Sequence, residues 1–293
     1  MQNHSNYWLI PPKGENMSMI EMASVQSAIS NFVRILTKKD IPVEYYSYNN
    51  GDSMTNGKNI TISSRINESN IDSVVGLALH EGSHCLLTDF NFIKKIGNYL
   101  AEKNLLGHKD IIYFLHNFVE DRRIDSFVYK NAPGYQEYYN AMYNRYFYSE
   151  NIDKGLKSSK FRKETWHCYM FRIANIFNKN TDLNALSKLK DVYNIIDLKN
   201  IDRLKSTKDT FEIAIKIYKV INSYISNISE EQTQKQNQKN KKNSNSKEKI
   251  EKEKIKKSFK LQENFINGKT PKSKTTKYIK ELVDIAQKHK LKN

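Results

Sequence analysis

The amino-acid sequence predicts an α+β fold that is mostly helical, with a small β-hairpin or sheet near the N-terminus. Two observations lead to this prediction. Apolar residues recur at helical spacing through most segments between residues 18 and 228. One stretch, residues 43–63, is instead rich in aromatic and β-branched residues, and it contains Asn56-Gly57, a strong hairpin signal.

The elements follow in order from these patterns. Residues 18–39 form the first predicted helix, which Pro42 terminates, and strands are expected on both sides of the turn, at 43–48 and 58–63. A less regular segment is expected around 178–206. Further helices are predicted at 71–87, 92–103, 109–129, 138–148, 163–177 and 210–228.

Composition divides the chain of 293 residues into three regions. Residues 1–228 contain the apolar segments and are expected to form one domain. Residues 229–260 are a lysine-rich linker, either disordered or a charged helix, because Gln, Asn, Lys and Ser dominate its first half and cannot bury a core. Residues 261–293 form a C-terminal segment, with a short amphipathic helix expected at 278–288.

The net charge of +16 lies mostly in the tail, because residues 229–293 carry +11 of it. That tail contains no arginine, the residue that reads base edges with two hydrogen bonds, so sequence-specific recognition of nucleic acid by it is not expected. Only weak, salt-sensitive contact with a polyanion remains open. A solvated linker is the simpler interpretation.

Cysteine usage and hydropathy predict a cytoplasmic protein. The two cysteines, Cys85 and Cys168, have neither a metal nor a redox spacing, which favours a reducing compartment. The N-terminus lacks a basic region followed by an apolar core, and no apolar run approaches the roughly 20 residues that a membrane span needs. No membrane contact is therefore expected.

The most informative motif is His-Glu-x-x-His, at His80, Glu81 and His84, inside an apolar run of helical length. Residues four apart share one face of a helix, so the two imidazoles can bind one zinc ion. Glu81 lies roughly 100° around the helix from His80, where it can reach a water molecule without binding the metal. That is the position of a general base in metal-assisted hydrolysis. The alternative is a pair of core histidines hydrogen-bonded to the backbone.

A third metal ligand is expected on the helix at 109–129. This helix is apolar on most sides and therefore buried, and buried carboxylates are costly unless they are paired or bind a metal. Glu120 is preferred for its longer reach, with Asp121 as the alternate, which Asp125 could orient from one turn away. The alternative is that Arg122 and Arg123 neutralise both carboxylates.

Together these two motifs resemble the zincin metallopeptidases of the gluzincin type. The resemblance implies that the histidine pair and a carboxylate hold Zn²⁺ and that Glu81 is the base; glutamate is the commoner third ligand in that group, which again favours Glu120. The chain departs from the usual Asn-Glu-x-x-Ser/Ala-Asp form around this ligand. It does not resemble the metzincins, because Leu87 and Phe90 stand where those have Gly and His.

A closer resemblance, over residues 20–225, is to predicted metallopeptidase regions of phage and bacterial proteins. Those proteins often continue into a von Willebrand factor A domain and are related to a cobalt-chelatase accessory subunit. This chain shows no Asp-x-Ser-x-Ser motif of such a domain. The motifs that carry the resemblance are Gly76-Leu77-x-Leu79-His80-Glu81-Gly82-x-His84 and Asn117-x-x-Glu120-Asp121-x-Arg123-Ile124.

The expected function is therefore that of a zinc peptidase acting on a peptide or protein substrate. The alternative is a non-catalytic, metal-binding adaptor that works with a von Willebrand factor A domain or an AAA+ ATPase. Zincins often use a tyrosine or histidine to stabilise the developing oxyanion, and Tyr135, Tyr139 and His167 are candidates here. An aromatic-dense helix is also what core packing produces.

Overall fold

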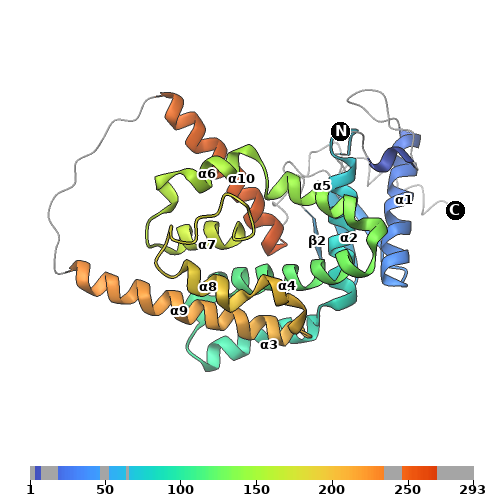
Figure 1. The fold of residues 1–293 in the computed structure, drawn as a ribbon. Helices are drawn as coiled ribbons and strands as arrows, with labels where there is room; N and C mark the ends of the chain where they lie inside the picture. The colour runs from blue at the N-terminus through green and yellow to red at the C-terminus, as the bar shows by residue number, and fades with distance from the viewer. Residues whose placement is uncertain (1–3, 8–18, 47–52, 64–65, 234–245, 269–293) are drawn as a thin grey trace, which may run out of the picture.

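The computed structural model describes residues 4–7, 19–46, 53–63, 66–233 and 246–268. It confirms a mostly helical α+β fold with a small three-stranded sheet (Figure 1). Among these residues, every helix is too short or too polar to cross a membrane. The amphipathic helix expected at 278–288 lies outside the described residues.

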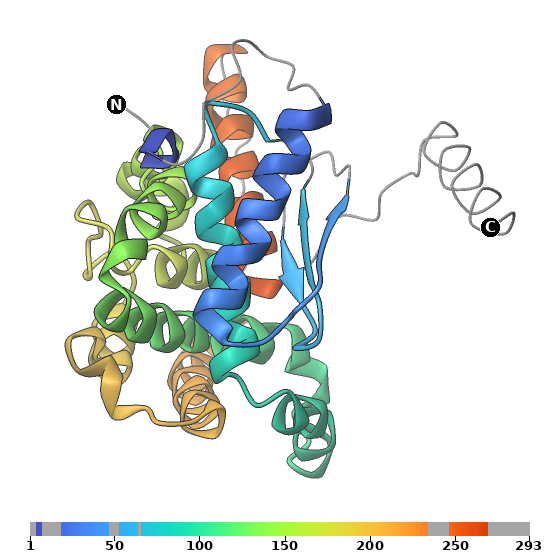
Figure 2. The same cartoon turned by 90° about the vertical axis from the view of Figure 1, so that its right-hand side faces the viewer.

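Helix α1 (Met19–Thr37) and the sheet pack against α2 (Ile71–Leu87), as Figure 2 shows. The sheet has the order β1 (Val43–Tyr46), β3 (Ile60–Ser63), β2 (Met54–Thr55). The predicted turn at Asn56-Gly57 joins β2 to β3 as an antiparallel pair, with a Gly57 φ of 83°. Strand β1 instead runs parallel to β3, so the first predicted strand is not the hairpin partner.

Helix α2 lies at the centre of this half of the molecule, and most of its residues are buried. Helix α5 (Gln136–Tyr146) crosses it closely. A Cβ atom on Gly76 would lie 2.3 Å from the carbonyl oxygen of Tyr138, so only glycine permits this crossing. The two helices therefore meet backbone to backbone one turn before the histidine motif.

The other half is arranged around α4 (Lys109–Asn131), which contacts α2 on one side and α9 (Thr207–Thr233) on another. Helix α3 (Phe90–Glu102) leads from α2 towards α4 and packs on α9. Side chains of α4 are buried from Ile112 to Asp125 on nearly every face, as the apolar pattern predicts. The carboxylates of Glu120, Asp121 and Asp125 therefore lie inside the protein.

The C-terminal part departs from the predicted regions. Helix α10 (Ser246–Asn267) crosses the expected boundary between 260 and 261 and packs on α4, α5 and α6. Its buried Gln262 donates to the carbonyl oxygen of Tyr146 at 2.9 Å, so the helix belongs to the core. Residues 229–233 continue α9. The remaining helices are α6 (Glu150–Lys157), α7 (Trp166–Ala174) and α8 (Leu189–Ile196), the last within the segment expected to be irregular.

Candidate metal centre

His80 and His84 on α2 face Asp121 on α4, and both imidazoles present Nε2 to the same carboxylate oxygen. His84 Nε2 lies 3.2 Å and His80 Nε2 lies 3.9 Å from Asp121 Oδ1. One ligand atom from each residue lies within 4.8 Å of the other two, a spacing that one metal ion can bridge.

The other nitrogen of each imidazole is held by a hydrogen bond. His80 Nδ1 lies 2.7 Å from Asp125 Oδ1. His84 Nδ1 lies 3.0 Å from Thr88 Oγ1, and that hydroxyl donates its own proton to Glu120 Oε1 at 2.8 Å. Both Nδ1 atoms are therefore donors, which leaves an unprotonated Nε2 facing the metal position in each neutral imidazole. The core-histidine alternative requires hydrogen bonds from the rings to the backbone, and within the described residues neither ring makes one.

The support around His80 extends through Asp125. The Tyr143 hydroxyl donates to Asp125 Oδ2 at 2.6 Å, and Arg122 Nη2 lies 3.5 Å from the same oxygen. Burial alone would lower the pKa of His80, but the Asp125 carboxylate raises it to about 9. The Asp125 pKa is lowered by His80 and Arg122 against the effect of burial. These groups form a buried network of opposite charges that fixes the imidazole.

The donor set fits a divalent metal such as zinc. Asp121 is buried, and within the described residues its Oδ2 has no hydrogen-bond partner. A buried carboxylate oxygen without a partner is costly, and metal binding would satisfy it. Two imidazoles and one carboxylate are the ligand types of catalytic zinc sites, which keep a further position open.

Glu81 lines the same cleft but lies outside this ligand group. Its Oε1 accepts a hydrogen bond from Ser53 Oγ at 2.8 Å. Burial raises the pKa of the Glu81 carboxyl, and the neighbouring histidines oppose that shift. Glu81 thus has the environment of a proton acceptor beside the metal position, as the motif predicts.

Glu120, the preferred third ligand from the sequence, has a different role. Arg123 donates to it from Nε at 3.0 Å and from Nη2 at 2.7 Å. Burial alone would raise the pKa of Glu120, but Arg123 lowers it to about 2. The geometry therefore favours Asp121 as the ligand, and the arginine-paired alternative describes Glu120. Three threonine hydroxyls also donate to Glu120: Thr88, Thr207 and Thr210.

The metal position opens into a cleft of about 260 Å³. The C-terminal end of α10 forms one wall, where the Phe265 ring centroid lies 4.8 Å from that of His80. From α4 the cleft is lined by Tyr113 and Asn117, and from β2 by Thr55. The remaining wall is mostly apolar and comes from Phe90, Ile93 and Ile266.

The three residues expected to stabilise an oxyanion lie away from this cleft. Tyr139 is buried, and its hydroxyl is hydrogen-bonded to Ser83 at 2.8 Å. Tyr135 packs against Phe32, with ring centroids 5.9 Å apart. His167 packs against two phenylalanine rings of another region. The core-packing alternative therefore describes Tyr139, whereas His167 is exposed on α7. Of the tyrosines on the described helices, Tyr113 of α4 lines the cleft.

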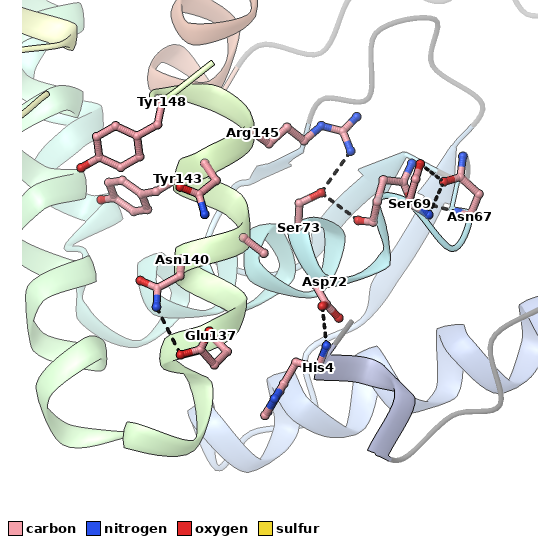
Figure 3. A pocket seen from close by; sticks show the side chains of 13 residues that line it. His4, Asn67, Ser69, Asp72, Ser73, Glu137, Asn140, Tyr143, Arg145 and Tyr148 are labelled. Atoms are coloured by element: carbon pink, nitrogen blue, oxygen red, sulfur yellow. Dashed lines mark hydrogen bonds between the residues drawn. The ribbon is translucent and has the colours of Figure 1, made fainter. Parts of the chain in front are cut away.

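A larger hollow of about 950 Å³ lies between the start of α2, α5 and His4 (Figure 3). Its carboxylate Asp72 accepts hydrogen bonds from the backbone N–H groups of His4 and Ser5 at 2.7 and 3.0 Å. Arg145 donates to Ser73 at 3.0 Å. This hollow is therefore polar, but the described residues that line it do not group as metal ligands.

Comparisons with known proteins add no assignment: no protein-family model, curated protein or solved structure matches the chain.

Sequence reasoning missed two residues that hold the site: Ser53 is hydrogen-bonded to Glu81, and Thr88 is hydrogen-bonded to His84. It named Asp125 as an orienting group, although for Asp121; the structure shows Asp125 bonded to His80. For Thr88 the signal was available, because it follows His84 by one helical turn.

Proposed function

We propose that this chain is a zinc-dependent hydrolase, and specifically a peptidase of the zincin type. The observation that carries the proposal is the convergence of His80 Nε2 and His84 Nε2 on Asp121 Oδ1, with both Nδ1 atoms already held by acceptors. Zinc bound there would polarise a substrate carbonyl and lower the pKa of a water to about 7.

The chain's own residues supply the rest of the chemistry. Glu81 accepts a proton from the attacking water and later delivers it to the leaving amine. Ser53 keeps the Glu81 carboxylate in place through its 2.8 Å hydrogen bond. Asp125 and Thr88 keep the imidazoles in the orientation that presents Nε2. A cytoplasmic location is part of the proposal, because Cys85 and Cys168 are both free.

The first test combines metal content with hydrolysis. Wild-type protein is expected to bind about one zinc per chain, because the described residues contain one group of metal ligands. It is also expected to cleave peptides of a random-sequence mixture, and mass spectrometry detects the products. Glu81→Gln should keep the zinc and lose about 10²- to 10⁴-fold in rate, the usual contribution of a general base. Glu102→Gln, an exposed carboxylate at the end of α3, is the matched control.

Two results would contradict the peptidase. Equal cleavage by wild type and Glu81→Gln would remove the general base from the mechanism. A wild-type protein that binds zinc and cleaves no peptide would favour the metal-binding adaptor, acting with an A-domain or ATPase partner.

A further inference from the structure

Helix α4 presents three polar residues to the metal cleft at intervals of four. Tyr113, Asn117 and Asp121 all line it. Residues four apart lie along one face of a helix. Asn117 and Tyr113 therefore follow Asp121 along one wall of the cleft, leading away from the metal position. Both Tyr113 and Asn117 are half-buried, which leaves their polar ends accessible to a ligand.

Among the polar groups of the site, these two side chains are available to a substrate. Within the described residues, neither the Tyr113 hydroxyl nor the Asn117 amide makes a hydrogen bond to another residue. By contrast, Ser53, Thr88 and Tyr143 donate to Glu81, Glu120 and Asp125, respectively. On α4, therefore, the two donors that face the cleft have no structural task.

We propose that Tyr113 and Asn117 donate hydrogen bonds to the substrate oxygen that becomes negatively charged during hydrolysis. This assignment rests on the proposed peptidase function and deepens it. Glu81 comes from α2, whereas the two donors come from α4, which faces α2 across the metal position through Asp121. Proton removal and charge stabilisation are thus supplied from two different helices.

The reaction is balanced with these roles. Water oxygen bonds to the carbonyl carbon, Glu81 takes one water proton, and the carbonyl π electrons move onto the oxygen that Tyr113 and Asn117 hold. When the C–N bond breaks, those electrons re-form the C=O bond and the amine nitrogen takes the proton from Glu81. The products are a carboxylic acid, which ionises, and an amine.

The surroundings strengthen these hydrogen bonds. Phe90 and Ile93 from α3 and Phe265 from α10 line the same cleft as the two donors. Apolar walls exclude water and lower the local dielectric, so a fixed donor is worth more to a developing negative charge than it is in solvent. The wall formed by α10 therefore contributes to the chemistry by lowering the local dielectric.

The test in the full chain uses Tyr113→Phe and Asn117→Ala on the peptide that wild type cleaves fastest. Each variant should lose about 10²- to 10³-fold in kcat, as removal of one oxyanion donor does, with KM changed much less. Zinc content should stay at the wild-type value. Tyr135→Phe is the matched control, because Tyr135 is also half-buried but lies outside the cleft, and it should keep wild-type kcat.

A binding measurement separates this inference from the proposed function. Acetohydroxamate places a negatively charged oxygen at a metal, and its binding to cobalt-loaded protein is read from the visible spectrum. Tyr113→Phe should weaken binding about tenfold, as loss of a hydrogen bond to a charged group does, whereas Tyr135→Phe should not.

The outcomes are distinct. Wild-type affinity and wild-type kcat in Tyr113→Phe and Asn117→Ala would overturn the inference while leaving the peptidase intact. Weaker hydroxamate binding in a protein that cleaves no peptide would support the two donors and overturn the peptidase. Failure of wild type to bind cobalt or zinc would overturn both.

Discussion

Glu120 and Asp121 are neighbours on one helix, yet they lie in opposite kinds of environment. The Glu120 carboxylate faces α9 and is fully hydrogen-bonded, by Arg123 and by Thr88, Thr207 and Thr210. The Asp121 carboxylate faces α2, and its Oδ2 has no partner within the part of the chain that the structure describes.

This contrast distinguishes a buried carboxylate that stabilises the fold from one that is available to bind a metal. A buried charge that serves stability has its hydrogen bonds completed by protein groups. A carboxylate that binds a metal keeps oxygen lone pairs that no protein donor occupies, so that the ion can use them. The metal ligand is identified by its unoccupied acceptor oxygen and not by the length of its side chain.

The largest expected effect is on metal affinity at Asp121. Asp121→Asn removes a ligand charge, so zinc affinity should fall by more than about 100-fold, since even loss of an outer hydrogen-bond partner costs about 10- to 100-fold. Equilibrium dialysis against buffered zinc measures it, with Asp110→Asn, an exposed site on α4, as control. If Asp121→Asn kept its zinc affinity and Glu120→Gln lost it, Glu120 and not Asp121 would be the third ligand.

Glu120 should instead affect stability. Glu120→Ala leaves Arg123 buried without its carboxylate, and breaking a buried ion pair of this kind costs about 3–5 kcal/mol. The free energy of unfolding in urea, measured on metal-free protein, reports this loss. Asp110→Ala should change it little. An undiminished unfolding free energy in Glu120→Ala would contradict the structural role of Glu120.

Intermediate effects are expected at the residues that hold the imidazoles. Asp125→Asn removes the negative charge of the group that accepts from His80 Nδ1–H, and Thr88→Val removes the hydroxyl that accepts from His84 Nδ1–H. Each change should lower zinc affinity by about 10- to 100-fold. Thr210→Val removes a hydroxyl that donates to Glu120 and to the carbonyl oxygen of Thr207 and contacts neither imidazole, so it serves as the control and should leave zinc affinity at its wild-type value. Equal losses in all three variants would indicate general destabilisation.

The smallest expected effect over a single step of the measurement is a pH dependence of the stability of metal-free protein. The pKa of His80 is raised to about 9 from an ordinary value of 6.5. A raised pKa contributes stability that is complete below 6.5 and is lost as pH rises through 9, with a slope of up to about 1.4 kcal/mol per pH unit. Urea unfolding from pH 6 to 9.5 measures it. Asp125→Asn should flatten the slope, and an unchanged slope would show that Asp125 does not hold the His80 proton.

The sequence by itself determined the features that depend on local spacing. Apolar periodicity predicted α2 at 71–87, as found, and α4 at 109–129, against Lys109–Asn131 in the structure. The spacing of His80 and His84 placed both imidazoles on one face, and Asn56-Gly57 marked the turn between β2 and β3. These features follow from backbone geometry within a few residues.

Only the tertiary structure decided which groups meet. Glu120 and Asp121 differ by roughly 100° around one helix, and the sequence allows either to face the histidines. The choice is made by α9, whose Thr207 and Thr210 bind Glu120 from about 90 residues further along the chain. Ser53, which directly precedes β2, and Phe265 from α10 reach the site in the same way. Such contacts depend on how distant segments pack, and local spacing does not encode them.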